Sequence, residues 1–305
     1  MLYRVYKLHF STPVRFGYNA GNDTQIAFCA DTLFSALYLS LMKDGRHEEL
    51  LKLVNENALR LSDAMPFDSE NLYISRPAGI YADNSDESFD PSVRKALKRI
   101  QYIPTSKLAA WLGGKVRPEE IRTEFGRKFD RTRVNLQETD PLPYQVDGFI
   151  FDDDCGLYFI AAGKDEKSAK FLDDAVQLLA ASGIGGKVSS GWGHFDLEMG
   201  ELQDTVLLKG LQATGEPCQM LISTAFPGEE EAEPVMRNAQ YVLKRRGGFT
   251  AELNEKPAKK RTTWHFAAGS TFTTRFDGVM MDVATVSSHP VWRYAKALMI
   301  GVNLK

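Results

Sequence analysis

A glycine-rich loop holds the residues of this chain whose types point most directly to chemistry. Residues 183–193 read GIGGKVSSGWG and contain five glycines, one lysine and two serines. Glycine lacks a Cβ and adopts positive φ, so such a loop can bring its backbone N–H groups close to another molecule. With the hydroxyls of Ser189 and Ser190 and the ammonium of Lys187, these groups suit a phosphate-rich ligand. The competing explanation is structural: a helix C-cap that runs into a glycine-rich turn.

The loop does not match three familiar motifs. A mononucleotide P-loop requires Gly, four residues and then Gly-Lys-Ser/Thr, whereas Val188 follows Lys187 and Ala181 occupies the first glycine position. The dinucleotide fingerprint follows a strand and opens a helix, whereas this loop follows a helix. A Gly-x-Ser-x-Gly elbow fails because Lys187 stands two residues before Ser189. The loop therefore suits a phosphate-rich ligand without matching any of these three sites.

Positive charge is concentrated in two further stretches, although the chain has a net charge of -3 and a pI near 6.0. The first run holds Lys115, Arg117, Arg122, Arg127, Lys128, Arg131 and Arg133. The second run holds Arg237, Lys244, Arg245, Arg246, Lys256, Lys259, Lys260 and Arg261. Binding of a polyanion depends on local charge, so an acidic body can carry a basic groove. A solvated face is the alternative interpretation of each run.

Length and composition limit the number of domains and the class of protein that this chain can be. The 305 residues suffice for one large domain or two of ordinary size, and the apolar fraction of 43% suffices for a core. Cys29, Cys155 and Cys218 are too far apart for a disulfide framework or a zinc motif. The absence of a long apolar run and of a signal-peptide pattern predicts a soluble, cytoplasmic protein without membrane contact. No metal or cofactor is expected.

The elements that must position these residues follow from hydrophobic spacing. Asp31 is expected to cap the first long helix, whose apolar residues recur on one face. The first two hundred residues predict strands at 2–10, 59–61, 72–74, 149–151, 157–161 and 195–198, and helices at 31–41, 48–57, 93–102, 106–112 and 168–181. Residues 119–143 are basic and poor in core residues, and they are expected to form a projecting hairpin or a mobile loop. The acidic turn at 152–156 is expected to join two strands as a hairpin. This order is the ferredoxin-like, split βαβ plan.

The last third is expected to be mostly β. It predicts strands at 205–211, 218–226, 239–243, 264–267, 271–276 and 297–302. The chain is thus expected to be α+β, with two ferredoxin-like or RRM-like halves. Residues 1–200 form the first half, with a β-hairpin thumb inserted at about 115–145, and residues 201–305 form a degenerate second half.

Several segments, collinear from end to end, resemble one family. They are residues 10–17, 30–37, 132–135, 184–193, 243–249 and 290–294, which read FSTPVRFG, ADTLFSAL, TRVN, IGGKVSSGWG, LKRRGGF and PVWRY. The chain resembles the RAMP-superfamily, Cas5-like fourth subunit of the type III-A CRISPR Csm effector complex. The order and spacing of the segments, rather than any single motif, carry this resemblance.

The resemblance implies a role in antiviral defence against foreign RNA and transcribed DNA. It implies binding of the 5′ handle of the CRISPR RNA, and docking against a Cas10-type large subunit and a backbone RAMP subunit. It also implies that catalysis belongs to those neighbours. A thumb-tip apolar residue would unstack a base.

The residues themselves are consistent with that role. Single-stranded RNA is held by its phosphates and by stacked or splayed bases. The expected RNA-binding residues are Arg15, Lys128, Arg131, Arg133, Gly183, Gly185, Gly186, Lys187, Ser189, Ser190, Gly191, Trp192, Gly193, Arg245 and Arg246. Trp192 either stacks on a base or packs under the loop. Arg245 and Arg246 contact either RNA or a neighbouring subunit.

Two other functions stay open. A CRISPR RNA-processing endoribonuclease of the same superfamily would use His9 or His194 as acid or base. A protein-only adaptor would make no RNA contact of its own. Asp31 could be read as a cleaving aspartate on a loop, but its place at the start of an apolar helix favours a cap. No catalytic residue is therefore expected.

Overall fold

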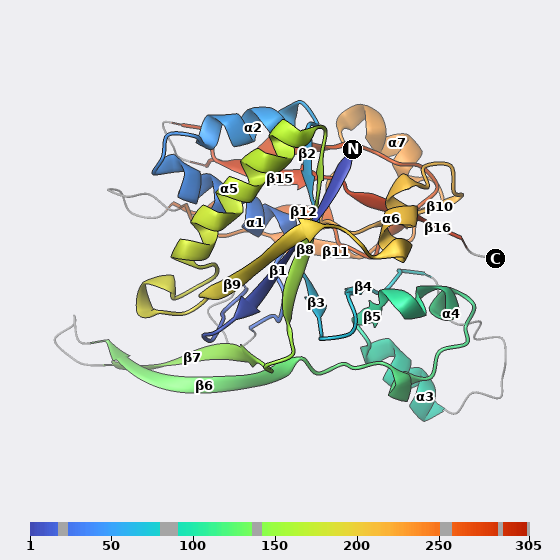
Figure 1. Ribbon diagram of the computed structural model, residues 1–305, viewed down its shortest axis with the longest axis horizontal. Helices are drawn as coiled ribbons and strands as arrows, with labels where there is room; N and C mark the ends of the chain where they lie inside the picture. The colour runs from blue at the N-terminus through green and yellow to red at the C-terminus, as the bar shows by residue number, and fades with distance from the viewer. Residues whose placement is uncertain (18–23, 80–90, 136–141, 251–257, 286–288, 304–305) are drawn as a thin grey trace.

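The computed structural model describes residues 1–17, 24–79, 91–135, 142–250, 258–285 and 289–303. Its centre is a five-stranded sheet with the order β2-β8-β1-β9, in which β3 also pairs with β8 (Figure 1). The strands are β1 (Leu2–Phe10), β2 (Leu59–Leu61), β3 (Met65–Phe67), β8 (Gly156–Gly163) and β9 (Phe195–Glu201). All of these pairs are antiparallel.

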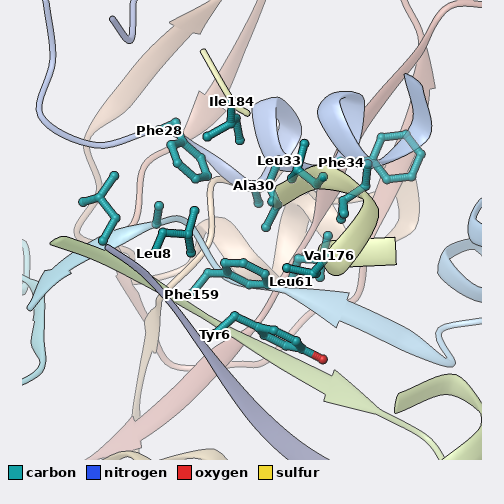
Figure 2. Close-up of a cluster of buried hydrophobic side chains, with 14 of the residues drawn as sticks. Tyr6, Leu8, Phe28, Ala30, Leu33, Phe34, Leu61, Phe159, Val176 and Ile184 are labelled. Carbon is teal, nitrogen blue, oxygen red and sulfur yellow. The ribbon is translucent and has the colours of Figure 1, made fainter. Parts of the chain in front are cut away.

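Three helices cover one face of this sheet. They are α1 (Ala30–Met42), α2 (His47–Asn55) and α5 (Glu166–Ser182). Alternate residues of β1 and β8, among them Tyr6, Leu8 and Phe159, pack with Leu33, Phe34 and Val176 in one buried cluster (Figure 2). Asp165 and Ser168 start α5 with a capping box, in which Ser168 N donates to Asp165 Oδ1 at 2.9 Å.

The second half of the chain covers the other face of the same sheet. Every residue of β8 is buried, and its other alternate residues, Tyr158, Ile160 and Ala162, belong to a second cluster. That cluster includes residues of α6 (Thr205–Gln212), β10 (Cys218–Leu221) and β16 (Met299–Val302). Because successive side chains of a strand point to opposite faces, β8 joins the two halves through a shared core.

The second half contains several small sheets. One has the order β13-β10-β16, and two others pair β11 with β12 and β14 with β15. The remaining elements here are β11 (Leu243–Arg246), β12 (Thr263–Phe266), β13 (Thr271–Phe272), β14 (Gly278–Asp282), β15 (Trp292–Lys296) and α7 (Glu229–Met236). The mixture of helices and antiparallel sheets confirms the α+β class.

The prediction of a strand at 205–211 is wrong, because these residues form α6. Asp204 accepts a hydrogen bond from Leu207 N at 2.8 Å and so caps the helix. The buried residues Leu207 and Leu211 of α6 are four positions apart, which is helical spacing. The strands expected at 218–226 and 271–276 are also shorter than predicted, since only β10 and β13 form there.

A smaller group of elements lies beside the sheet, at the lower right of Figure 1. It contains β4 (Tyr73–Ser75), α3 (Pro91–Arg99), β5 (Tyr102–Pro104) and α4 (Leu108–Leu112), with 3-10 turns η1 (Thr105–Lys107) and η2 (Pro118–Glu120). β4 pairs with β5, and Ile74, Ile103 and Trp111 join the second cluster. No helix of the described residues is long and apolar enough to span a membrane.

The expected projecting hairpin is present. β6 (Gly126–Asn135) and β7 (Leu142–Phe151) pair over their whole length and extend away from the body (Figure 1). The expected thumb tip, residues 136–141, lies outside the described residues. The prediction that 149–151 and 157–161 pair as a hairpin is wrong: β7 pairs with β6, and β8 pairs with β1, β2 and β3. The acidic turn instead carries the chain from the hairpin into the sheet.

Candidate nucleic-acid interface

Two glycines close the glycine-rich loop on itself. Gly183 ends α5 with a φ of 81° and donates its N–H to Leu179 O at 2.8 Å. Ile184 N donates to Gly193 O at 3.0 Å, and a Cβ on Gly193 would lie 2.1 Å from Ile184 O. Gly193 has a φ of 74°, so a side chain there is excluded both by space and by backbone conformation. For Gly183 and Gly193 the structural explanation is therefore confirmed.

The loop also docks on the segment that follows β1. Gly186 N donates to Arg15 O at 2.9 Å, and Gly193 N donates to Pro13 O at 2.8 Å. A Cβ on Gly185 would lie 2.9 Å from Arg15 O. The glycines of this part of the loop were expected to let its backbone approach a ligand. In the structure, the same backbone approaches residues 13–15 of this chain. The exposed tip of the loop consists of Ser189, Ser190 and Gly191 beside the half-buried Lys187.

The far end of the hairpin, close to its tip, meets the tip of the loop. Arg133 Nη1 donates to Ser190 Oγ at 3.4 Å, and the Arg133 guanidinium carbon lies 5.8 Å from the ring centroid of Trp192. Lys187 Nζ lies 5.4 Å from the ring centroid of Tyr144, the cross-strand partner of Arg133. Two cations and the loop hydroxyls therefore gather at one place.

Arg15 joins the same place from a third segment. Its Nε donates to Asp147 Oδ1 at 3.1 Å, and the Thr24 hydroxyl donates to the other carboxylate oxygen. Burial acts to raise the pKa of Asp147, but these two donors hold it below its usual value. Val14 and Phe149 exchange backbone hydrogen bonds of 2.8 and 2.9 Å beside this pair. Three segments far apart in sequence thus form one unit, the loop–hairpin junction, whose members are Arg15, Arg133, Tyr144, Lys187, Ser189, Ser190 and Gly191. The expected RNA-binding residue Arg131 lies on the same face of the hairpin as Arg133, with its guanidinium carbon 5.4 Å from the ring centroid of Phe129.

Two predicted residues do not present their side chains at the junction. Trp192 is only 4% exposed and packs against Phe129, with 5.5 Å between ring centroids. It has no free face for a base, so the packing alternative is correct and the stacking alternative is wrong. Lys128 is exposed, but it alternates with Phe129 and Arg131 and lies on the opposite face of the hairpin.

The second basic run is divided between two faces of β11. Arg246 points inward, where its Nε and Nη2 donate to the two oxygens of Asp31 at 2.8 and 2.7 Å. Arg293 Nε lies 3.8 Å from the same carboxylate. The RNA contact expected of Arg246 is therefore corrected to an internal ion pair. Arg245, which precedes Arg246 on the strand, is exposed.

This ion pair also corrects the prediction for Asp31. Cys29 occupies the N-cap position of α1, without a side-chain capping bond, and Asp31 lies in the first turn. Burial acts to raise the pKa of Asp31, but the Arg246 guanidinium holds it below its usual value. An aspartate that is 6% exposed and bound by arginine is not placed to attack a substrate.

A groove that sequence reasoning missed lies between the first half and β11. Its volume is about 600 Å³, and its polar lining includes Gln25, Arg99, Gln101, Arg122 and Lys244. These residues come from distant segments, and no motif in the sequence links them. The groove places further cations and amide groups close to the segment that contains Arg15, since Gln25 N donates to Phe16 O at 2.9 Å.

Comparison with curated proteins decides the family. A CRISPR system protein Csm4 of Mycobacterium tuberculosis is 30% identical over 312 residues, covering 98% of this chain and 97% of the relative. The chain belongs to the Csm4 family of CRISPR proteins. Csm4 of Streptococcus thermophilus is likewise 30% identical, over 311 residues and the full length of both chains. A family model described as the CRISPR Csm4 C-terminal domain matches residues 214–302.

Solved Csm4 structures share the fold. A Csm3–Csm4 subcomplex from a type III-A CRISPR–Cas interference complex matches with a TM-score of 0.70 at 17% identity, covering 99% of this chain and 100% of that one. A Csm1–Csm4 cassette in complex with pppApA matches with a TM-score of 0.66 at 21% identity, covering 100% and 99%. The resemblance to the fourth Csm subunit is confirmed by the curated relatives at 30% identity.

The two histidines considered as acid or base, His9 and His194, lie near one edge of the sheet. His9 is opposite Asp196 in the β1–β9 ladder, two residues after His194. His9 Nε2 lies 3.3 Å from Glu198 Oε2, and its ring meets Phe67 edge to face. Thr12 Oγ1 accepts a hydrogen bond from the backbone N–H of His194. Among the described residues no hydrogen bond joins the two imidazoles.

The acidic turn is an ion-pair cluster. Asp152, Asp154 and Cys155 bring ligand atoms within 4.8 Å of one another, and they are the one such group in the described ranges. Arg122 donates to Asp154 at 2.6 Å and to Asp152 at 3.0 Å, so both carboxylates are engaged by a guanidinium. Burial raises the pKa of the Cys155 thiol to about 12, which disfavours the thiolate that a metal requires. This donor set does not suit a resident metal.

Proposed function

We propose that this member of the Csm4 family is a non-catalytic RNA-binding scaffold of a type III-A CRISPR interference complex. It holds the 5′ handle of the CRISPR RNA at the loop–hairpin junction. The observation that carries the proposal is the contact of Arg133 with both Ser190 and Trp192, which unites the hairpin and the glycine loop. Cations from separate segments thereby face one ligand.

The junction suits the backbone of a single strand. Lys187 and Arg133 supply positive charge, and Ser189 and Ser190 supply hydroxyl donors. Arg15 adds a guanidinium that is ion-paired with Asp147. Nothing lies within 4 Å of the position where Gly191 would carry a Cβ, so a ligand can approach this backbone from outside. Proteins that hold single-stranded RNA without reading every base combine a positive groove with backbone contacts.

The strand order supports the finer fold assignment. Taking β1, β2, β8 and β9 as four successive strands, the order β2-β8-β1-β9 with helices after the first and third strands is that of a ferredoxin-like unit. Residues 1–200 form this unit together with the hairpin insertion. Residues 201–305 form the degenerate half that closes its second face.

The partners follow from the relatives. Solved Csm4 chains occur with Csm1 in one complex and with Csm3 in another. By family, this chain docks a Cas10-type large subunit and a backbone RAMP subunit, and acts in the cytoplasm in antiviral defence. Catalysis belongs to those neighbours.

A salt titration in the assembled complex tests the proposal. The affinity for a guide RNA with the repeat-derived handle is measured against salt for the wild type, Lys187→Ala and Arg133→Ala. The matched control is Lys167→Ala, an exposed lysine on α5. Each junction variant is expected to bind more weakly and to reduce the slope of log K against log salt by about 0.7, the value for one phosphate of a single strand. Unchanged affinity and slope in both variants would make this chain a protein-only adaptor.

A histidine-dependent endoribonuclease is the second candidate, favoured by the place of His9 opposite Asp196 in the β1–β9 ladder, since Asp196 is two residues from His194. It predicts that His9→Ala or His194→Ala abolishes maturation of precursor CRISPR RNA by the reconstituted system. Unchanged maturation in both variants would contradict the endoribonuclease hypothesis and would favour the RNA-binding scaffold.

A further inference from the structure

The β11–β12 pair has two chemically different faces. Lys244, Arg246 and His265 belong to the inward face, and Arg246 binds Asp31 there. Arg245 and Trp264 are directly opposite each other in the ladder, and both are exposed. Opposite residues of an antiparallel pair share a face. Arg245 and Trp264 therefore stand side by side on the outward face.

Large apolar side chains are also exposed in the segment that contains β11. Trp264 is 54% exposed, Leu243 47% and Phe249 60%, and Tyr241 and Val242 are also exposed. We call Tyr241, Val242, Leu243, Arg245, Phe249 and Trp264 the β11–β12 platform. Exposed aromatic faces of this kind are costly in water unless a partner covers them.

The exposed charged side chains in the described residues 241–250 and 258–266 are all cationic: Arg245, Lys259 and Arg261. Lys244 and Arg246 belong to the inward face, where Arg246 is paired with Asp31. A single-stranded nucleic acid surface combines cations with aromatic stacking faces, which is the combination that Arg245 and Trp264 present side by side. The composition favours RNA as the occupant.

The groove connects this platform with the junction. Val242, Leu243 and Lys244 line the groove from one side, and residues 25–27 line it from the other. Gln25 forms a backbone bridge with Phe16, the neighbour of Arg15. The groove thus lies between the segment that contains Arg15 and β11.

We propose that the β11–β12 platform is a second RNA-contact surface, on which Trp264 stacks one base of the single-stranded guide and Arg245 binds the adjacent phosphate. The inference rests on the proposed function and extends it, because it places a base-stacking contact on the far side of the groove from the junction. Neither residue is placed in the loop–hairpin junction, so the two surfaces can be tested separately.

Photocrosslinking in the complete complex tests this inference. Guide RNAs carry 5-iodouridine at one handle position at a time, and crosslinked peptides are mapped by mass spectrometry. One position, or two adjacent ones, is expected to crosslink to the peptide that contains Trp264. Trp264→Ala should remove the crosslink and weaken guide binding by about tenfold, the scale of one base stack. Trp264→Phe should retain most of the affinity, and Met42→Ala, an exposed apolar residue of α1, should change nothing.

Three outcomes separate the hypotheses. No crosslink at any position, while Lys187→Ala and Arg133→Ala still weaken binding, overturns the platform and leaves the junction. Loss of a neighbouring subunit from the Trp264→Ala complex, with guide affinity per assembled complex unchanged, overturns it in favour of protein docking. A crosslink at Trp264, with guide binding unchanged in Lys187→Ala and Arg133→Ala, supports RNA contact at the platform and contradicts RNA binding at the junction.

Discussion

The guanidinium of Arg133 lies over the indole of Trp192, with 5.8 Å between the guanidinium carbon and the ring centroid. Arg133 belongs to the projecting hairpin, and Trp192 to the glycine-rich loop. Trp192 is buried beneath this contact, and Arg133 keeps a hydrogen bond to Ser190. The indole therefore sets the position of the cation and of the loop tip together, which makes it a positioning residue for the junction.

Removal of the indole should loosen both segments. Trp192→Ala is expected to lower the free energy of unfolding by about 3–5 kcal/mol, the usual cost of truncating a buried tryptophan. Trp192→Phe keeps a packed ring and should cost clearly less. Urea denaturation of the full chain measures both. An unfolding free energy for Trp192→Ala within 0.5 kcal/mol of the wild type, a margin usual for surface changes, would contradict the burial of this side chain.

The hairpin leaves no room for a methyl group beneath the same ring. A Cβ on Gly148 would lie 2.7 Å from Phe129 and 2.9 Å from Trp192. Gly148→Ala is expected to cost about 1–3 kcal/mol through overpacking and to weaken guide binding by displacing the loop. Gly200→Ala on β9 is the matched control, because nothing lies within 4 Å of its Cβ position. Equal stability and affinity of the two alanine variants would contradict the packing.

Two adjacent arginines should behave in opposite ways. Arg246→Ala removes both close hydrogen bonds to the buried Asp31 carboxylate, leaves only Arg293 at 3.8 Å, and should cost about 3–5 kcal/mol. Arg245→Ala, on the exposed face, should change the free energy of unfolding by less than about 0.5 kcal/mol. Thermal or urea denaturation compares them directly. A larger loss for Arg245→Ala than for Arg246→Ala would reverse the assigned faces of β11.

His265 should make stability depend on pH. Burial lowers its pKa to about 4, and the Thr263 hydroxyl, which accepts a hydrogen bond from Arg293, can donate to Nε2 only when the imidazole is neutral. The unfolded histidine titrates near 6.5, so between about pH 6.5 and 4 the unfolded state binds more protons than the folded state. The free energy of unfolding should fall across this window as pH is lowered, by at most about 3 kcal/mol.

The control for this pH dependence is His265→Gln. Urea titrations of the wild type and the variant between pH 7 and 4.5 should diverge, with the variant losing less stability as pH falls. Parallel curves for the two proteins would show that His265 does not titrate as its burial requires.

Local features of the sequence predicted much of the fold. Hydrophobic spacing located β1, α1 and α5, and the basic, core-poor stretch after residue 119 indicated the hairpin. The wrong prediction at 205–211 could have been avoided from local sequence, because Asp204 followed by leucines at helical spacing indicates a capped helix. A strand was predicted there because a short apolar run is compatible with both the two-residue period of a strand and the 3.6-residue period of a helix.

The site was harder to predict because its contacts join distant residues. Strand alternation separates Arg245 from Arg246, but only the fold shows which of them meets Asp31, which is 215 residues from Arg246. The same limit applies to Trp192, since an indole in a glycine loop can stack on a base or pack under the loop. Phe129 on the hairpin decides between them.

The most direct test of the central claim is a thermodynamic cycle between the junction and the handle. The affinities of guide RNAs with the native handle and with a scrambled handle are measured for complexes that contain the wild-type chain or the Lys187→Ala/Arg133→Ala double variant. If the junction holds the handle, the wild-type preference for the native handle should fall to about one in the double variant, while the affinity for the scrambled guide changes less. An undiminished preference in the double variant would show that other subunits hold the handle, and it would contradict the account.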